Sequence, residues 1–392
     1  MPDQPGPRRQ TEIYMEGMAD VTPEVPVAFE DLQAAAHEAL EGQAYDYVAG
    51  GAGGEGTVDH NRRAFASWRL QPRHLRDVAE RDLSVDLLGR ELPAPVVLAP
   101  VGVQSIVHEG GERASARAAA DLGLPFVTSS AASQTLEEVA AAAGDGPAWF
   151  QLYWPTDPDV AASFVDRAER AGYEAIVVTV DTPMLAWRER DLGRAYLPFL
   201  DGEGIANYTS DDAFRARLDR PPEENELAAI REFVEVFGNP GLTFADLAGL
   251  AERTDLPVVV KGLLHPEDAR EAVDAGADAV WVSNHGGRQV DRSVAALDAL
   301  PAIADAVGGA VPVIFDSGIR RGADVLTALA LGADAVGLGR PYVYGLALEG
   351  EAGVRAVCEN LLADLDLTLG LCGRRRVAEV DEDLLLPAGA SP

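Results

Sequence analysis

Eight short apolar segments recur along the chain, and Ala-rich stretches with helical spacing separate them. The segments are 95–100, 125–130, 148–153, 175–181, 257–262, 279–286, 311–317 and 335–340. Most are nearly continuous hydrophobic runs, as expected for strands that are buried on both faces. Strand and helix alternating eight times over about 250 residues is the pattern of a (β/α)8 barrel. A doubly wound open sheet is the alternative, but it does not favour the number eight.

Three segments fall outside this alternation. Residues 1–27 are rich in proline and are expected to be a loose leader, followed by an amphipathic helix at 29–40. About sixty residues, 182–241, separate the fourth strand from its helix, and a connection of this length predicts a lid, with a subunit contact as the alternative. Residues 374–392 form a C-terminal tail. We therefore expect one α/β domain at 28–373, a TIM barrel with an N-terminal helical extension and a long insertion after strand 4.

The composition indicates a soluble globular protein, with 47% hydrophobic and 24% charged residues. No apolar run approaches the roughly 18–20 residues of a membrane span, and the N-terminus lacks the apolar core of a signal peptide. We therefore expect a cytoplasmic location. Two cysteines, Cys358 and Cys372, are too few for a disulfide framework, and no Cys or His group has metal-ligand spacing. No metal is expected.

The charge is strongly acidic, at −32. Such a balance argues against a protein that binds the phosphates of nucleic acids. Of the 32 basic residues all but one are arginine, the exception being Lys261. An acidic surface almost without lysine is typical of adaptation to high salt. Codon bias in a GC-rich genome is the alternative explanation for the missing lysines, but it does not explain the excess of acidic residues.

Polar residues, or the segment Pro-Val-Gly at 100–102, follow nearly every predicted strand, where the active site of a (β/α)8 barrel lies. They are Pro100, Val101, Gly102, Ser129, Gln151, Tyr153, Thr179, Asp181, Lys261, Ser283, His285, Arg288, Asp316, Ser317, Gly318, Arg320, Gly339 and Arg340. After the last two strands, the segments D-S-G-I-R-R and G-R-P place glycine amides and arginines where barrels bind phosphate. The sequence therefore predicts an enzyme whose ligand carries a phosphate.

The segment S-N-H-G-G-R-Q at 283–289 resembles the active-site signature of the FMN-dependent 2-hydroxy acid oxidising enzymes, which include glycolate oxidase and lactate oxidase. The resemblance extends over about residues 28–373. The segments V-D-T-P-M-L-A-W-R-E-R-D-L, Y-L-P-F-L, G-E-G-I-A-N-Y and G-R-P-Y-V-Y-G-L-A-L are most similar to the lactate 2-monooxygenase branch. The resemblance implies FMN as cofactor and a small (S)-2-hydroxy acid, L-lactate first, as substrate. It also implies O2, a quinone or another carrier as electron acceptor, and a homotetramer or larger assembly.

The resemblance also implies a role for each candidate residue. His285 would be the base, oriented by Asp181. Arg288 and Arg188 would bind the substrate carboxylate, and the hydroxyls of Tyr47 and Tyr153 would contact the substrate. The implied contacts of the flavin ring are Pro100, Val101, Gly102, Ser129, Gln151, Thr179, Lys261 and Ser283, and those of the ribityl phosphate are Asp316, Ser317, Gly318, Arg320, Gly339 and Arg340. Ala131 stands where glycolate oxidases carry a bulky tryptophan, which argues against glycolate as the preferred substrate.

These residue types suit the chemistry on physical grounds. An imidazole beside a carboxylate is a competent base, and an arginine fork matches a carboxylate with two parallel hydrogen bonds. Three alternatives stay open at this stage. The protein could be a phosphate-binding lyase or isomerase with Lys261 as a Schiff-base amine, or a flavin-binding protein without activity. Asp316 could simply cap a helix that begins near residue 319.

Overall fold

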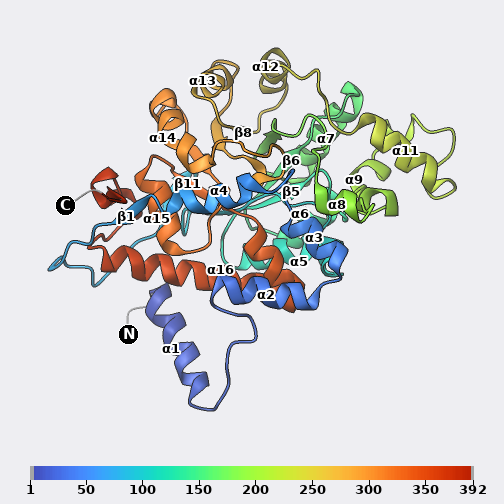
Figure 1. Ribbon diagram of the computed structural model, residues 1–392. Coiled ribbons are helices and arrows are strands. Elements are labelled where there is room, and N and C mark those ends of the chain that lie inside the picture. The colour runs from blue at the N-terminus through green and yellow to red at the C-terminus, as the bar shows by residue number, and fades with distance from the viewer. Residues whose placement is uncertain (1–3, 390–392) are drawn as a thin grey trace.

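The computed structural model describes residues 4–389 and confirms the barrel (Figure 1). Eight parallel strands close in the order β10-β11-β4-β5-β6-β7-β8-β9. They are β4 (Val96–Leu98), β5 (Phe126–Ser129), β6 (Ala148–Leu152), β7 (Ile176–Thr179), β8 (Val258–Leu263), β9 (Ala279–Val282), β10 (Val313–Phe315) and β11 (Ala335–Leu338). Each of them overlaps one of the eight predicted segments. The open-sheet alternative is wrong, because β10 and β11 connect β9 to β4 and close the ring.

The strands read as continuous apolar runs because both of their faces are buried. Val97, Val127 and Trp281 pack inside the barrel, whereas Val96 and Leu98 pack beneath the surrounding helices. Those helices are α5 (Gly111–Asp121), α6 (Leu136–Ala143), α7 (Pro158–Ala171), α12 (Phe244–Arg253), α13 (Pro266–Asp274), α14 (Ala296–Val307), α15 (Gly322–Ala330) and α16 (Arg340–Leu371). A hairpin of β2 (Val85–Leu87) and β3 (Arg90–Leu92) contributes apolar side chains to the interior cluster.

The expectation of a loose leader at 1–27 is wrong for residues 5–17, because Pro5–Gly17 forms helix α1 beside α16 (Figure 1). Long-range contacts order this segment. The backbone N–H of Gly6 donates to Asp366 of α16 at 3.0 Å, and Arg81 donates two hydrogen bonds of 2.7 Å to the same carboxylate. Residues 1–3, and 390–392 of the predicted tail, lie outside the described range.

The N-terminal extension continues with α2 (Phe29–Ala39), α3 (Gly42–Ala49) and α4 (Gly56–Phe65), and α2 confirms the amphipathic helix. Near the C-terminal limit of the described residues, β12 (Leu385–Pro387) pairs antiparallel with β1 (Trp68–Leu70), which follows α4. In the part of the chain that the structure describes, no helix has both the length and the apolar character needed to cross a membrane.

The insertion after β7 is largely packed. It contains α8 (Glu189–Gly193), a 3-10 helix (Pro198–Asp201), α9 (Ala206–Thr209), α10 (Asp212–Arg215) and α11 (Glu226–Val236). Five of its aromatic residues pack into one cluster, made of the buried Phe199, Tyr208, Phe214 and Phe233 and the partly buried Phe237. Tyr208 also packs edge-on against Phe164 of α7, with ring centroids 4.9 Å apart. Residues 198–237 are therefore part of the packed structure.

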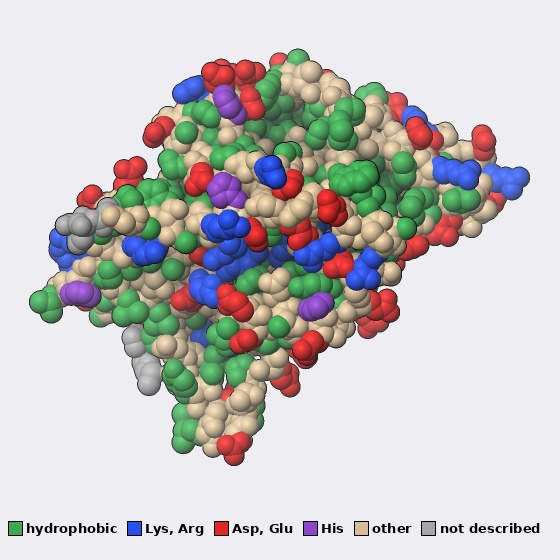
Figure 2. Space-filling model, viewed as in Figure 1, with side chains coloured by type: hydrophobic (Ala, Val, Ile, Leu, Met, Phe, Trp, Pro, Cys, Tyr) green, Lys and Arg blue, Asp and Glu red, His purple; other side chains and the backbone are tan. Residues whose placement is uncertain are grey.

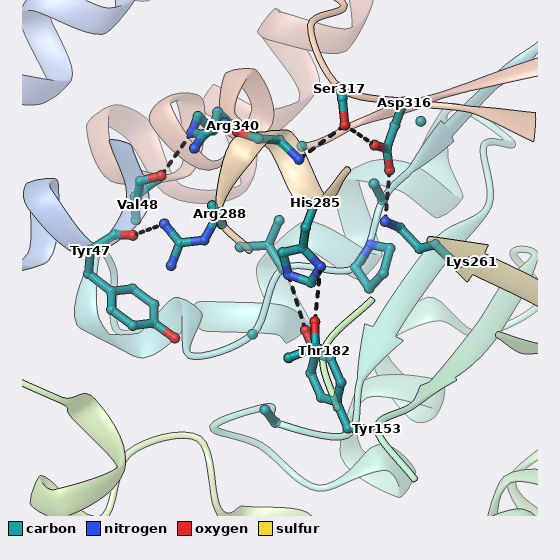
Figure 3. Close-up of a pocket in the computed structure, with 18 of the residues that line it drawn as sticks. Tyr47, Val48, Tyr153, Thr182, Lys261, His285, Arg288, Asp316, Ser317 and Arg340 are labelled. Carbon is teal, nitrogen blue, oxygen red and sulfur yellow. Dashed lines mark hydrogen bonds and ion pairs between the residues drawn. The ribbon is translucent and has the colours of Figure 1, made fainter. Parts of the chain in front are cut away.

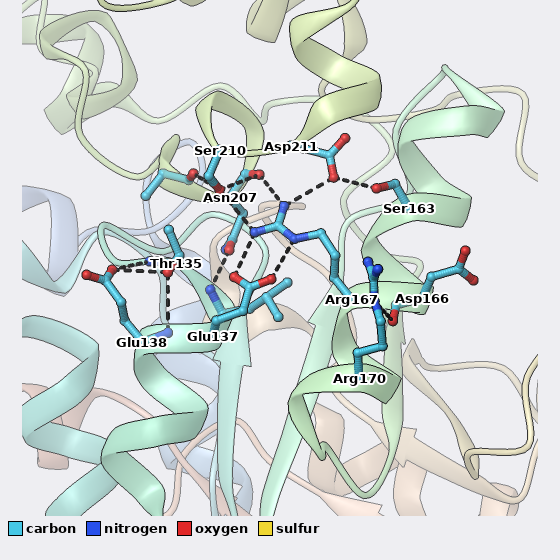
Figure 4. Close-up of polar contacts among 12 residues, drawn as sticks. Thr135, Glu137, Glu138, Ser163, Asp166, Arg167, Arg170, Asn207, Ser210 and Asp211 are labelled. Atoms are coloured by element: carbon cyan, nitrogen blue, oxygen red, sulfur yellow. Dashed lines mark hydrogen bonds and ion pairs between the residues drawn. The ribbon is translucent and has the colours of Figure 1, made fainter.

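A buried arginine fastens this insertion to the barrel helices (Figure 4). Arg167 of α7 donates two hydrogen bonds of 2.8 Å to Glu137 of α6. The same guanidinium reaches the Asp211 carboxylate at 3.1 Å and the Asn207 carbonyl at 2.8 Å. The Asn207 side-chain amide in turn donates to the carbonyls of Ser129 and Ser130, where β5 ends. The insertion thus has a fixed position above the strand ends.

Replacing Arg167 with methionine is expected to lower the free energy of unfolding by about 3–5 kcal/mol, because the Asp211 charge would stay buried without its cation. Denaturant unfolding monitored by fluorescence measures the change. The control is Arg63→Met, which removes an exposed pair with Asp59 at 3.2 Å, and we expect a loss below about 0.5 kcal/mol. Equal losses for the two variants would show that the Arg167 network does not stabilise the fold.

Candidate active site

One pocket opens where the barrel strands end, and it gathers most of the residues predicted from the sequence (Figure 3). Its lining includes Tyr47, Pro100, Val101, Gly102, Tyr153, Arg188, Lys261, His285, Arg288, Asp316, Ser317, Gly318, Arg320, Gly339 and Arg340. The predicted residues Ser129, Gln151, Thr179 and Ser283 are buried at the strand ends but are not part of the lining. Arginine side chains gather near the middle of the face shown in Figure 2, although the protein as a whole is acidic.

His285 and Asp181 form a hydrogen-bonded pair at this pocket. His285 lies in a tight turn after β9, and its Nδ1 is 2.9 Å from Oδ1 of Asp181. Thr182 donates to the same carboxylate oxygen at 2.9 Å. A carboxylate can only accept, so Nδ1 carries the proton and Nε2 presents its lone pair, 3.4 Å from the hydroxyl of Tyr153. The histidine is therefore arranged to accept a proton at Nε2.

Burial sets the protonation of this pair. It lowers the pKa of His285 below the ordinary value, although the Asp181 carboxylate favours the charged form. Burial alone would raise the pKa of Asp181, but its interactions with His285, together with the charge of Lys261 and the hydrogen bond from Thr182, outweigh burial and keep this pKa below the ordinary value. The result at neutral pH is a neutral imidazole beside an ionised carboxylate, as a general base requires.

Two arginines stand beside the histidine, and neither has a carboxylate partner at hydrogen-bonding distance within residues 4–389. Arg288 donates to the carbonyls of Tyr47 and Gly50, and Arg188 donates to the Arg288 carbonyl at 3.2 Å and to Gln289 at 3.0 Å. Burial lowers the pKa of Arg288 to about 9, and the positive charge of Arg188 acts in the same direction. Two adjacent guanidiniums bonded to neutral groups form a binding site for a carboxylate.

A second pair of arginines lies after β10 and β11. Burial lowers the pKa of Arg320 to about 9, with Arg340 adding to the effect, and burial also lowers the pKa of Arg340. The Nε of Arg320 is buried and has no partner among the residues described. A Cβ added at Gly339 would meet only Val101, at 3.9 Å, so the backbone there borders open space. Both guanidiniums otherwise donate to backbone carbonyls, Arg320 to Ile319 and Arg340 to Val48, Gly50 and Gly286. The open space, the glycine and two cations bonded only to neutral groups fit the phosphate implied by the sequence.

Lys261 lies on β8, two residues before the strand ends, and lines the same pocket. Its ammonium is 3.0 Å from Asp316 and 2.9 Å from the hydroxyl of Ser283. An ammonium paired with a carboxylate is a poor nucleophile, so this geometry disfavours the Schiff-base alternative. The helix-cap alternative for Asp316 is wrong, because α15 begins at Gly322 and Asp324 accepts the N–H groups that precede it.

Unpartnered polar groups at the strand ends fit a planar heterocycle. The amide nitrogen of Gln151 and the hydroxyl of Thr179 are buried and have no partner among residues 4–389. Both residues lie at the carboxyl ends of their strands, and Thr179 pairs in register with Lys261. Buried polar groups in native proteins are almost always hydrogen-bonded, so a ligand with polar ring edges is the natural partner. A flavin ring has such edges.

Some pocket residues were not predicted from the sequence. They are Val48, Ala99, Thr182, Leu185, Phe199, Phe237, Ile319 and Gly337, together with Gln289, which holds Arg188. Gln289 belongs to the signature at 283–289 and Thr182 directly follows Asp181. Their positions in the sequence could therefore have indicated that they lie near the pocket. Phe199 and Phe237 lie deep in the insertion, and nothing local in the sequence indicates that they line the pocket.

A (β/α)8 barrel whose pocket brings together a partly buried His–Asp pair, four arginines and unpartnered polar groups at the strand ends fits a flavin-dependent oxidoreductase. The chain belongs to the FMN-dependent dehydrogenase family, whose model matches residues 36–387. Its cofactor is accordingly FMN, and it is an FMN-dependent 2-hydroxy acid oxidoreductase.

Relatives and solved structures agree with this assignment. The chain is 46% identical to an L-lactate oxidase from Lysinibacillus sphaericus over 348 residues, which cover 89% of each chain. It is 40% identical to 2-hydroxyacid oxidase 1 from Mus musculus, over 92% of this chain and 96% of the relative. The fold is similar to a crystal structure of mandelate oxidase with (S)-2-phenylpropionate, at 40% identity, a TM-score of 0.81, and coverage of 92% and 98% of the two chains.

Proposed function

We propose that this enzyme oxidises L-lactate, or an (S)-2-hydroxy acid of similar size, and that it acts as a lactate 2-monooxygenase. The observation that carries the substrate proposal is the meeting of three features in one pocket. His285 presents Nε2, Arg188 and Arg288 offer a carboxylate site, and apolar groups of Ala131 and Phe199 form another part of the wall. A small 2-hydroxy acid carries a matching hydroxyl, carboxylate and alkyl group.

The residues of this chain have separate tasks in the reaction. FMN supplies the two-electron acceptor when it is bound. The two guanidiniums of Arg188 and Arg288 hold the substrate carboxylate, and they orient the 2-hydroxyl toward Nε2 of His285 and the hydroxyl of Tyr153. His285 accepts the proton released by oxidation, and the Asp181 carboxylate stabilises the imidazolium that forms. Lys261 places a positive charge at the pocket, which favours the uptake of negative charge there.

Retention of the product would produce the monooxygenase outcome. Pyruvate that meets hydrogen peroxide before release is converted to acetate, carbon dioxide and water. The insertion supports retention because it adds Leu185, Phe199 and Phe237 to the pocket wall. Since residues 198–237 are packed on the barrel, the proposed lid is confined to the segment 182–197, which carries Arg188.

Product analysis tests this proposal. Aerobic turnover of L-lactate should give acetate and carbon dioxide in equal amounts, with little free peroxide. Pyruvate and peroxide in equal amounts would assign the enzyme as a simple oxidase. Turnover that requires an added quinone or dye would assign it as a carrier-linked dehydrogenase.

Three other expectations stay proposals: a homotetramer, a cytoplasmic location, and stabilisation by molar salt through screening of the acidic surface.

Flavin reduction by L-lactate should slow as the pH falls below neutrality. Protonated His285 cannot accept a proton, and burial lowers its pKa, so the neutral form persists below the ordinary histidine value. We expect kcat/KM for L-lactate to stay level from pH 8 down to about pH 6.5 and to fall tenfold per pH unit below the lowered pKa. An acidic limb centred above about pH 7 would contradict this account of the His285 environment.

A further inference from the structure

The turn that carries the base has an unusual backbone. His285 has φ of 57°, and it is followed by Gly286 at 64° and Gly287 at 80°. Ser317, on the neighbouring loop after β10, has φ of 83°. Positive φ is uncommon for residues other than glycine and persists only where the surroundings hold it. Two such residues stand side by side at this pocket, and hydrogen bonds join their loops.

Two serine hydroxyls hold this turn, and Figure 3 shows one of them, that of Ser317. Ser317 Oγ accepts from the N–H of Gly286 at 3.0 Å and from the N–H of Asn284 at 3.3 Å. Ser283 Oγ accepts from the N–H of His285 at 3.0 Å. The backbone of residues 284–286 is therefore bonded at three consecutive N–H groups to only two side chains.

The direction of these hydrogen bonds is fixed by Asp316. Its Oδ1 accepts from Ser283 at 2.6 Å and from Ser317 at 2.7 Å, and its Oδ2 pairs with Lys261 at 3.0 Å. A carboxylate only accepts, so each hydroxyl must turn its single proton to Asp316. The oxygen lone pairs are then left facing the backbone N–H groups. A single carboxylate thus orients both hydroxyls.

We propose that Ser317 is a positioning residue for the base, acting through its hydroxyl on the turn 284–286 rather than as a contact of the cofactor. The hydroxyl keeps His285 at the angle where Nδ1 meets Asp181 and Nε2 faces the pocket. Glycine would adopt this φ without strain, but it lacks the hydroxyl that bonds the turn. The proposed role therefore explains why a serine occupies a strained position. This inference rests on the proposed role of His285 as base.

Two variants separate the hydroxyl from the backbone. Ser317→Ala keeps the Cβ and the strain but removes the hydroxyl, whereas Ser317→Gly removes both. We expect both variants to slow anaerobic flavin reduction by L-lactate about 10- to 100-fold at saturating substrate, as a displaced base does. KM, and the dissociation constant of pyruvate measured from flavin absorbance, should change less than about twofold, because Arg188 and Arg288 are untouched.

Stability and FMN affinity provide readouts that do not depend on turnover. We expect the unfolding midpoint of Ser317→Gly to exceed that of Ser317→Ala, because glycine relieves the strain. The control is Leu75→Gly, at a fully exposed residue with φ of 56°, which should raise the midpoint and leave the reduction rate unchanged. FMN affinity should stay within severalfold of the parent in both Ser317 variants.

Three outcomes would overturn the proposal. Normal reduction by Ser317→Ala would show that the hydroxyl is not needed. Slow reduction by the glycine variant alone would place the effect in the backbone. Weakened FMN binding with a normal rate at saturating FMN would make Ser317 a cofactor contact. If the proposed function itself is wrong, the parent enzyme is not reduced by L-lactate, or His285→Gln is reduced as fast as the parent, and the two failures are thereby distinguished.

Discussion

Replacing His285 with glutamine is expected to slow anaerobic flavin reduction by L-lactate at least about a hundredfold, with FMN still bound. A positioned general base contributes about 10²–10⁴ to a rate. The glutamine amide can keep a hydrogen bond to Asp181, but it cannot accept the proton that Nε2 takes. Asp181 and Thr182 would remain in place, because their own hydrogen bond of 2.9 Å does not involve the imidazole. Stopped-flow absorbance near 450 nm measures the rate.

The matched control for this variant is His265→Gln. His265 is exposed at the N-terminus of α13, where its ring accepts the N–H of Glu267 at 3.2 Å, and it lies outside the pocket lining. We expect this variant to be reduced at the parent rate. Near-parental reduction of the His285 variant would remove His285 from the role of base, whatever the behaviour of the control.

Replacing Lys261 with methionine should have the second largest effect. The variant keeps a long apolar side chain but leaves the Asp316 carboxylate without its cation at 3.0 Å. Two unit charges about 4–8 Å apart interact with an energy of about 2–4 kcal/mol at an effective dielectric constant of 20. Flavin reduction and sulfite addition both increase negative charge on the ring. We therefore expect a lower reduction potential and a sulfite dissociation constant raised at least about tenfold.

Two further variants separate charge from shape at this position. Lys261→Met combined with Asp316→Asn removes both charges, so the sulfite constant should return toward the parent value. Lys261→Arg keeps the charge, but the larger planar group must displace Ser283 or Asp316, which lie 2.9 and 3.0 Å from the ammonium. We expect weaker FMN binding or slower reduction in that variant. Parental potential, sulfite affinity and rate in all three variants would make Lys261 a bystander.

The sequence predicts the barrel well because its strands are buried on both faces. Runs such as 175–181 leave no polar face, and their number and spacing determine the closed topology. Helix α1 could not be predicted in the same way. Its contact between Gly6 and Asp366 joins residues 360 positions apart, and no periodicity within the leader indicates it.

In the candidate site, too, some residues could be predicted from local sequence and others depend on distant contacts. His285, Asp181 and the paired arginines stand at strand ends or within a specific signature, so their proximity could be expected before the fold was known. Phe199 and Phe237 reach the pocket through tertiary contacts of the insertion, such as the hydrogen bond of Arg167 to Asn207 and the packing of Phe237 against Tyr153. The positive φ of Ser317 could not be predicted from the sequence. It accompanies three hydrogen bonds of the Ser317 hydroxyl, to Asn284, Gly286 and Asp316.

The most direct test of the central claim is anaerobic titration of the purified, FMN-loaded protein with the two enantiomers of lactate. L-lactate should bleach the flavin absorbance near 450 nm completely, in single-exponential kinetics that saturate with concentration, and should yield one pyruvate per flavin. D-lactate should leave the spectrum unchanged, apart from the shift caused by reversible binding of its carboxylate. An oxidised flavin after prolonged exposure to excess L-lactate would contradict the proposed function.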